Sequence, residues 1–309
     1  MKRLSLVVPV YFEEECIEQF VQEVTAVLNR QNISYEIVFI DDGSKDRTVE
    51  LIKKAAATNE HIKLLEFSYN HGKQAAASAG ITYASGDYLL YMDPDLQDPP
   101  EEIPRFLAEI EKGKDLVFGV RKEKHDSILN KFFSAIFWFV LDKMTGLDIP
   151  RGIAVMRIFN RRFANQFLKY GEQNRFIEGI FMHIGMKWTT IDIAQRPRFA
   201  GETKFSFARK MNLAFDAIFD FSALPLRMAA RAGLFLSFAG LLALATVVLL
   251  KILLIDFQAG WSSLFSIIVL GTGVNLYFVG IVAIYVGKIY REVKGRPLFS
   301  IKETTNIDQ

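Results

Sequence analysis

The chain has 309 residues, 50% of them hydrophobic, and a mean hydropathy of +0.17, which is too apolar on average for a purely soluble protein. A formal net charge of +2 gives no reason to expect a nucleic-acid partner. The single cysteine, Cys16, excludes an internal disulfide bond and suits a reducing compartment. These properties point to a membrane-associated protein with one sizeable domain.

Apolar runs that suit strands alternate with segments of helical periodicity along the first 120 residues. The expected strands are residues 4–10, 36–40, 62–67, 88–92 and 115–120, and the expected helices are residues 14–30, 48–59, 73–84 and 101–112. Alternation of this kind predicts an α/β fold with a Rossmann-like, mostly parallel sheet that helices cover on both faces.

Polar clusters follow three of the expected strands, at residues 11–13, 41–44 and 93–97. Ligands of such sheets bind outside the carboxyl ends of the strands, so we expect these clusters to converge on one crevice. A dinucleotide-binding dehydrogenase is disfavoured, because no Gly-x-Gly-x-x-Gly follows the first strand and Pro9 stands where that turn would begin. Asp41 and Asp42 are compatible with two roles, capping the next helix or accepting hydrogen bonds from a nucleobase or ribose.

The cluster after residues 88–92 suits a divalent cation. Asp93, Asp95 and Gln97 offer two carboxylates and an amide oxygen, which favour Mg²⁺ or Mn²⁺ over zinc. These groups cannot complete an octahedral shell, so coordination positions remain for water and substrate phosphates. The alternative is that the two aspartates only cap a turn before Pro99 and Pro100.

Residues 128–141, which are rich in phenylalanine with Lys131 and Asp142 near the ends, and residues 205–224, which mix phenylalanines with charged side chains, both suit juxtamembrane helices that lie in the interface plane. The alternative for both is core packing or a subunit contact, and a homo-oligomer is compatible with the sequence. Residues 232–250 and 264–286 are then free of charges and long enough to cross about 30 Å of hydrocarbon.

The basic residues around these spans set the expected topology. They lie at Arg227, Arg231, Lys288, Arg291, Lys294 and Arg296, whereas the linker between the spans holds only Lys251 and Asp256. By the positive-inside rule, both termini lie on the cytoplasmic side of the inner (plasma) membrane. The expected organisation is a cytoplasmic domain at 1–204, a juxtamembrane region at 205–231, a transmembrane hairpin at 232–287 with helices near 232–254 and 264–286, and a cytoplasmic tail at 288–309.

Several motifs in a fixed order carry a resemblance to a known family. They are Val-Pro-Val-Tyr-Phe-Glu-Glu at 8–14, Asp-Asp-Gly-Ser-Lys-Asp at 41–46, Asn-His-Gly-Lys-Gln at 70–74 and Asp-Pro-Asp-Leu-Gln-Asp-Pro at 93–99, followed by basic and aromatic motifs at 198–205 and 221–227. The sequence resembles glycosyltransferase family 2. More narrowly, it is similar to polyprenyl-phosphate glycosyltransferases, the group that contains dolichol-phosphate mannose synthases and bactoprenol glucosyltransferases.

The resemblance implies a GT-A fold that binds a nucleotide sugar and a divalent metal. The positions that match nucleotide-sugar-binding residues are Pro9, Tyr11, Glu13, Asp42, Lys73 and Asp93. The positions that match metal ligands are Asp93, Asp95 and Gln97, and those that match an acceptor-phosphate site are Arg121, Arg198 and Lys204. The catalytic positions that it implies are Asp95, Arg121, Arg157 and Lys204.

One departure concerns a carboxylate. Relatives commonly carry an acidic residue two positions before the arginine of a Phe-Arg-Leu motif, and here Val155 occupies that place before Arg157. No role of that carboxylate is transferred to this chain. A phosphate monoester has a second pKa of about 6 and already carries an attacking oxyanion at neutral pH, so transfer to such an acceptor does not require a carboxylate base.

The predicted function is therefore inverting transfer of a hexose from a nucleotide sugar to undecaprenyl phosphate at the cytoplasmic face of the membrane, within cell-envelope synthesis. UDP-glucose is the first choice of donor, with UDP-N-acetylglucosamine and GDP-mannose as alternatives. A catalytically silent membrane protein that binds nucleotide sugar is the alternative from another class. A processive polysaccharide synthase is disfavoured by the absence of a Gln-x-x-Arg-Trp motif and by only two spans.

Overall fold

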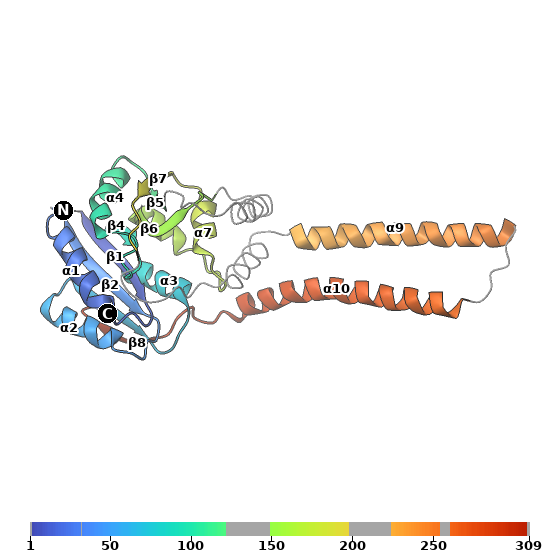
Figure 1. Ribbon diagram of the computed structural model, residues 1–309, viewed down its shortest axis with the longest axis horizontal. Coiled ribbons are helices and arrows are strands. Elements are labelled where there is room, and N and C mark those ends of the chain that lie inside the picture. Colours follow the sequence, from blue (N-terminus) through green and yellow to red (C-terminus); the bar gives the residue numbers. More distant parts are fainter. Residues whose placement is uncertain (1, 32, 122–148, 198–223, 254–259, 308–309) are drawn as a thin grey trace. The chain divides into compact units, whose positions relative to one another are not determined.

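The computed structural model describes residues 2–31, 33–121, 149–197, 224–253 and 260–307 (Figure 1). The chain divides into two compact units. The first comprises Met1–Asp142, Gly146–Lys210 and Arg296–Gln309, and the second comprises Lys143–Thr145 and Met211–Gly295. The expected interface helix at 128–141, all of the one at 205–224 except Leu224, and the predicted site residues Arg198 and Lys204 lie outside the described residues.

The first unit is built on the predicted alternation of strands and helices. Strands β1 (Arg3–Val10), β2 (Ser34–Asp41), β3 (Ile62–Phe67) and β4 (Tyr88–Tyr91) are parallel and adjacent in the order β3-β2-β1-β4. The helices between them are α1 (Ile17–Leu28), α2 (Thr48–Thr58) and α3 (Lys73–Tyr83), and the 3₁₀ helix η1 (Pro100–Glu102) and α4 (Ile103–Ile110) follow β4. The mostly parallel α/β sheet is thus confirmed.

The remaining strands make the sheet mixed. Strand β6 (Ile153–Asn160) runs antiparallel between β4 and β5 (Leu116–Arg121), and β7 (Trp188–Ile193) pairs in parallel with β5. At the other edge, β8 (Ile301–Thr305) lies antiparallel to β3. Helices α6 (Arg161–Phe167) and α7 (Ile177–His183) follow β6. The order across the eight strands is β7-β5-β6-β4-β1-β2-β3-β8. Strands β6, β7 and β8 were not predicted from the sequence.

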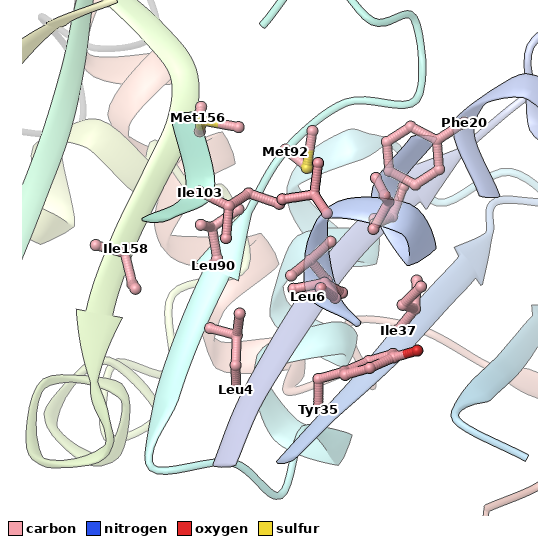
Figure 2. Packing of buried hydrophobic residues seen from close by; sticks show 14 of the residues in the cluster. Leu4, Leu6, Phe20, Tyr35, Ile37, Leu90, Met92, Ile103, Met156 and Ile158 are labelled. Carbon is pink, nitrogen blue, oxygen red and sulfur yellow. The ribbon is translucent and has the colours of Figure 1, made fainter. Parts of the chain in front are cut away.

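Alternate residues of the central strands form the main core (Figure 2). Leu4 and Leu6 of β1 and Leu90 of β4 are fully buried and pack in one cluster with Phe20 of α1 and Ile103 of α4. Every second side chain along a strand points to the same face of the sheet, so this cluster defines the face that α1, α2 and α4 cover.

Helix α3 lies on the opposite face, and its small side chains let it approach the strands closely. Its buried residues are Ala75, Ala76, Ala77, Ser78, Ala79, Gly80 and Ile81. A Cβ atom added at Gly80 would lie 2.3 Å from Cγ1 of Val7 and 2.6 Å from Cδ1 of Ile40, so the backbone of α3 rests directly on β1 and β2.

The second unit contains two long apolar helices, α9 (Leu224–Leu253) and α10 (Trp261–Lys294), which make few contacts with each other (Figure 1). Their windows Pro225–Ala243 and Ile267–Lys294 are long and apolar enough to cross a membrane, and no part of either window is buried inside the protein. A core helix of a soluble protein would be covered, whereas these helices expose their apolar side chains. Gly295, at a φ of +56°, ends α10.

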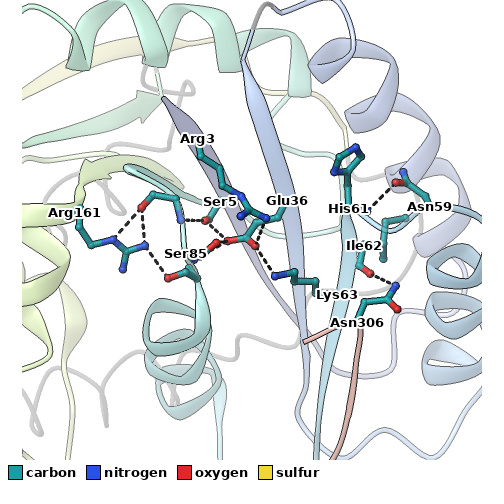
Figure 3. A network of polar contacts seen from close by, with 12 residues as sticks. Arg3, Ser5, Glu36, Asn59, His61, Ile62, Lys63, Ser85, Arg161 and Asn306 are labelled. Carbon is teal, nitrogen blue, oxygen red and sulfur yellow. Dashed lines mark hydrogen bonds and ion pairs between the residues drawn. The ribbon is translucent and has the colours of Figure 1, made fainter. Parts of the chain in front are cut away.

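A buried polar network surrounds Glu36, near the start of β2 (Figure 3). The fully buried carboxylate accepts hydrogen bonds from Oγ of Ser5 at 2.5 Å and from the backbone N–H of Ser85 at 2.6 Å. Its other oxygen forms ion pairs with Arg3 at 3.0 Å and Lys63 at 2.9 Å. Because Ser85 directly follows α3, the network fixes the carboxyl end of that helix to the sheet.

Arg161 reinforces the same region from α6. Its guanidinium donates to the backbone carbonyls of Ala84 at 2.7 Å and Gly86 at 2.6 Å. The turn between α3 and β4 is therefore held by charged groups from two other elements (Figure 3).

Glu36→Gln is expected to lower the free energy of unfolding by roughly 3 kcal/mol, because it leaves the partly buried cations Arg3 and Lys63 without their buried counter-charge. Burial acts to raise the pKa of Glu36, but the hydrogen bonds from Ser5, Lys63 and Ser85 outweigh it and lower the pKa from 4.5 to about 2. The stabilisation is thus complete above pH 4.5 and is lost as the pH falls toward 2. Urea unfolding in detergent, followed by circular dichroism at several pH values, measures both effects.

Glu111→Gln is the matched control, since its ion pair with Lys2 is half exposed. It should change the free energy of unfolding by less than about 0.5 kcal/mol. Equal stability of Glu36→Gln and the native chain at neutral pH would contradict the role given to the network.

Candidate active site

The candidate site lies where the order of the strands reverses. From β1 the chain goes to β2 and β3 on one side, whereas β4 is the neighbour of β1 on the other side, and a crevice forms at the carboxyl ends of strands at such a switch point. The structure brings the three predicted polar clusters together there. The backbone N–H of Phe12 donates to Oγ of Ser44 at 3.0 Å, and the N–H of Glu13 donates to Oγ1 of Thr48 at 2.9 Å.

Asp42 organises the loop that precedes α3. Its buried carboxylate accepts hydrogen bonds from the backbone N–H groups of His71 at 2.6 Å and Gly72 at 2.9 Å, and from Nδ2 of Asn70 at 2.9 Å. Burial raises the pKa of Asp42, although these donors oppose the shift. The predicted nucleotide-binding carboxylate therefore also fixes the loop from Asn70 to Gly72, which leads directly into Lys73.

The neighbouring Asp41 is committed to the turn that follows β2. Its Oδ2 accepts from the backbone N–H groups of Gly43 at 3.1 Å and Ser44 at 3.0 Å. Burial raises the pKa of Asp41 as well. Asp41 thus holds its own turn, Asp42 reaches across to another loop, and the cap position of α2 is Arg47. The nucleotide-binding role of Asp42 stays a prediction.

Lys73, at the first position of α3, links that loop to the acidic cluster after β4. Its Nζ lies 2.6 Å from Oδ2 of Asp93. Desolvation acts to lower the pKa of Lys73, but the charge of Asp93 outweighs it and raises the pKa, so the ammonium group is charged at neutral pH. Half of the Lys73 side chain is exposed, so the cation is available to an anionic ligand.

The acidic cluster has a strained backbone. Leu96 has a φ of +58°, in the left-handed region that a branched residue rarely adopts, although its side chain is buried. The turn is closed by the backbone N–H of Gln97, which donates to Oδ1 of the buried Asp95 at 3.1 Å. Phe12, in the cluster after β1, has a φ of +55°. Strain of this kind concentrates at functional sites, and here it marks two of the three predicted clusters.

The segment after β7 lies against the acidic cluster. Nε2 of Gln195 donates to Oε1 of Gln97 at 3.2 Å, and the backbone N–H of Arg196 donates to the Gln97 carbonyl at 2.9 Å. The guanidinium of Arg196 forms ion pairs at 2.8 Å with Glu23 and Glu101. This segment leads into the predicted residue Arg198.

Arg121 is held by a residue that sequence reasoning missed. Its guanidinium pairs with Oδ1 of the buried Asp98 at 2.8 Å, and Oδ2 of Asp98 accepts from the backbone N–H of Met156 at 2.9 Å. Asp98 thus connects the acidic cluster to the ends of β5 and β6. Its place directly after the Asp93–Gln97 motif was the only signal in the sequence.

Arg157 is buried beneath the site and surrounded by aromatic rings. Its guanidinium carbon lies 5.3 Å from the ring centroid of Tyr91, 5.9 Å from that of Phe118 and 5.7 Å from that of Phe181. Burial raises the pKa of the Tyr91 phenol to about 12, so the ring stays neutral beside the cation. Cation–π contacts of this kind stabilise a desolvated guanidinium.

Glu178, in the first turn of α7, is the counter-charge of this arginine. Its Oε1 lies 3.0 Å from Nη2 of Arg157, while Nε of Arg157 donates to the Val155 carbonyl at 3.0 Å. In the part of the chain that the structure describes, Nη1 of Arg157 has no hydrogen-bond partner. The strand lacks a carboxylate at Val155, and α7 provides one to Arg157. Nothing in the sequence pointed to Glu178, because α7 was not predicted.

The remaining predicted nucleotide-binding residues surround the end of β1. Pro9 is buried within the strand, and Tyr11 is 36% exposed with its ring 4.4 Å from that of Phe12. The carbonyl of Glu13 accepts from the N–H of Cys16, which starts α1. The backbone N–H of the buried Asp42 donates to the carbonyl of Val10, the residue before Tyr11, at 3.0 Å. An exposed aromatic ring and a buried carboxylate on adjacent strand ends suit the stacking and hydrogen bonding of a nucleobase.

The donor set fits a hard divalent cation. Asp93 and Asp95 carry carboxylate oxygens in one tight turn, and the Gln97 amide oxygen, two residues further on, accepts a hydrogen bond from Gln195. Within residues 2–31, 33–121, 149–197, 224–253 and 260–307, no three His, Cys, Asp or Glu side chains group closely enough to form a complete metal site. An ion held here would therefore keep coordination positions for phosphate oxygens and water.

Comparisons with known proteins identify the family. The model of Glycosyl transferase family 2 matches residues 5–168. The glycosyltransferase YkcC of Bacillus subtilis is 35% identical over 305 residues, which is 98% of this chain and 94% of that protein. An undecaprenyl-phosphate 4-deoxy-4-formamido-L-arabinose transferase of Photorhabdus laumondii is 31% identical over 309 residues, which is 98% of this chain and 94% of that protein. The chain belongs to glycosyl transferase family 2 and is a glycosyltransferase.

Solved structures agree with this assignment at the level of the fold. Glucosyl-3-phosphoglycerate synthase from Mycobacterium tuberculosis superposes with a TM-score of 0.50 at 14% identity, covering 71% of this chain and 78% of that chain. The sheet unit therefore has the GT-A-like fold that the sequence predicted.

Glu178→Ala is expected to lower the free energy of unfolding by roughly 2 kcal/mol, because Arg157 is then buried without an anionic partner. Adding Arg157→Met should recover part of the loss, since the uncompensated charge is removed. Urea unfolding of the two single variants and the double variant gives the coupling free energy.

Glu109→Ala, which breaks the surface pair with Lys112, is the control and should change stability by less than about 0.5 kcal/mol. Strictly additive losses in the double variant would show that the two side chains are not coupled.

Proposed function

We propose that this glycosyltransferase moves a hexose from a nucleotide sugar to undecaprenyl phosphate, with inversion at the anomeric carbon, at the cytoplasmic face of the membrane. UDP-glucose is the proposed donor. The observation that carries the proposal is the position of Asp93 and Asp95 at the switch point, with Asp93 paired to Lys73, which directly follows the loop that Asp42 holds. This arrangement supports binding of a metal and a nucleoside diphosphate at the carboxyl ends of the strands.

The acceptor is inferred from the relatives and from the apolar helices. The Photorhabdus relative, which matches 98% of this chain, is named for transfer to undecaprenyl phosphate. Helices α9 and α10 give the chain apolar surface that suits a bilayer, in which a polyprenyl acceptor resides. Basic residues outside the apolar spans support a topology with both termini in the cytoplasm.

The reaction is a single displacement that needs no proton transfer. An oxygen of the acceptor phosphate attacks the anomeric carbon, the bond from that carbon to the diphosphate oxygen breaks, and the nucleoside diphosphate leaves with the electron pair. Asp93, Asp95 and Gln97 would hold a Mg²⁺ or Mn²⁺ ion, which would neutralise charge on the leaving diphosphate. Lys73 adds a second positive charge beside Asp93.

The basic residues have separate roles. Arg121, oriented by Asp98, is proposed to bind the acceptor phosphate together with Arg198 and Lys204. Arg157 does not reach the surface, so it acts as a fixed positive charge beneath the site and not as a direct ligand. A phosphate oxyanion is already the nucleophile, and the absence of a carboxylate at position 155 is therefore compatible with turnover.

The proposed organisation follows the sequence boundaries, with one addition. Residues 1–204 form the donor domain, 205–231 a juxtamembrane region and 232–287 the hairpin. Residues 288–309 are a cytoplasmic tail whose strand β8 is part of the sheet.

Asp95→Asn is expected to reduce transfer at least about 1,000-fold while the protein stays folded, because the amide keeps the shape of the side chain but not its charge. The measurement is transfer of radiolabelled sugar from UDP-glucose to undecaprenyl phosphate in detergent with Mn²⁺ or Mg²⁺, alongside the thermal unfolding midpoint. Chelation with EDTA should abolish transfer by the native chain. Asp192→Asn, at an exposed position of β7, is the control and should retain full turnover. Undiminished turnover of Asp95→Asn would refute the metal assignment.

Mass spectrometry of the glycolipid made from a mixture of UDP-glucose, UDP-N-acetylglucosamine and GDP-mannose identifies the donor. We expect a hexose linked to undecaprenyl phosphate, formed from UDP-glucose. A product carrying N-acetylglucosamine, or a hexose formed only from GDP-mannose, would replace the proposed donor. Saturable donor binding without any product would refute transfer to this acceptor.

A further inference from the structure

The segment from Phe299 to Asn306 extends the sheet, and its first residues contact a loop of the candidate site. Strand β8 pairs antiparallel with β3 from Leu64 to Phe67. Asn306 anchors the far end of the strand, because its Nδ2 donates to the carbonyls of Ile62 at 2.9 Å and Ala56 at 3.1 Å (Figure 3). The strand is therefore fixed in register at the end remote from the site.

Ion pairs hold β8 along its length. Lys302 lies 3.1 Å from the buried carboxylate of Glu66, and Glu303 lies 2.9 Å from Lys53. Lys53 also pairs with Glu66 at 2.5 Å, so one buried carboxylate on β3 attracts cations from both α2 and β8. This arrangement stabilises the pairing of two elements that are far apart in the sequence.

At its amino end, the same segment reaches the loop before α3. The ring of Phe299 stacks on Phe67 at a centroid distance of 5.4 Å and an interplanar angle of 4°. The backbone N–H of Ser300 donates to Nε2 of His71 at 3.2 Å, and the Ser300 carbonyl accepts from the N–H of Ser68 at 3.0 Å. The His71 ring also packs edge-on against Phe67 at 5.3 Å.

His71 lies in the loop that Asp42 holds. Its backbone N–H donates to Oδ1 of Asp42 at 2.6 Å, while its side chain accepts from Ser300, so the residue is fixed from two sides. The next residue, Gly72, has a φ of +94°, and Lys73 then reaches Asp93. Contacts thus run without a break from the C-terminal segment through His71 to the two carboxylates of the donor site.

We propose that Phe299 and Ser300 form a structural part of the nucleotide-sugar site, and that His71 is a positioning residue through which they fix the Asn70–Gly72 loop for donor binding. This inference rests on the proposed function, because it assigns the segment to the donor half of that site. A loop that is already ordered loses less conformational entropy when a ligand binds, so the contact raises affinity without touching the ligand.

The competing explanation is that β8 only covers the edge of β3, since exposed edge strands are prone to pair with other chains. The two explanations differ in what His71 does. Protection of an edge requires the ladder between β3 and β8 but not the hydrogen bond from Ser300 to His71. Variants that remove this hydrogen bond and leave the ladder in place therefore separate them.

The test is UDP binding to the full-length chain in detergent with Mn²⁺, measured by isothermal titration calorimetry, together with the KM values for UDP-glucose and undecaprenyl phosphate. His71→Ala removes the acceptor, His71→Gln restores an oxygen at similar reach, and Ser300→Pro removes the donor N–H. We expect His71→Ala and Ser300→Pro to raise the Kd for UDP and the donor KM by roughly tenfold, with the acceptor KM unchanged. His71→Gln should recover most of the loss.

Glu303→Ala is the control on the same strand, because it breaks only an exposed ion pair and should change the Kd by less than about twofold. If Ser300→Pro does not fold, the two His71 variants decide the question, since they leave β8 intact. If His71→Ala binds UDP with unchanged affinity, the role given to the segment is overturned, whether or not the unfolding midpoint falls. The proposed function is not affected by that result. A native chain that binds neither UDP nor GDP overturns the proposed function itself.

Discussion

The close contact of α3 with the sheet is the constraint on which the site depends. Gly80 lets the helix backbone rest on Val7 and Ile40, and no larger residue fits at that point. The Glu36 network fixes the carboxyl end of the helix, and Lys73 at the amino end then meets Asp93. A wider separation between helix and sheet would move the Lys73 cation away from the acidic cluster, so packing of small residues determines the electrostatics of the site.

Several buried ions of this unit pair with partners from other elements. Asp98 binds Arg121 and the backbone of β6, and Glu178 binds Arg157 among aromatic rings. Such pairs stabilise little in net terms, because desolvation opposes their attraction, but each fixes the geometry of the groups that it joins. The structure thus uses ion pairs to define positions around the switch point and apolar burial to stabilise the fold.

The first half of the fold was predictable because its strands and helices alternate with clear periodicity and the strands are continuous apolar runs. Strand β8 was not, since residues 301–305 are mostly polar and become a strand only by pairing with β3. In the site, Asp42, Asp93 and Asp95 were recognisable from their positions after strands. Glu178 was not, because its role depends on Arg157, which is distant in the sequence and adjacent only in the folded protein.

The position of β8 after both apolar helices has a consequence for biosynthesis. The ribosome makes β3 early, whereas its partner β8 emerges only after both apolar helices have been synthesised. The edge of β3 and the side chain of His71 remain without these contacts until then. A nascent chain that lacks the two apolar helices therefore also lacks β8, and the order of synthesis ties completion of the sheet to prior production of these helices.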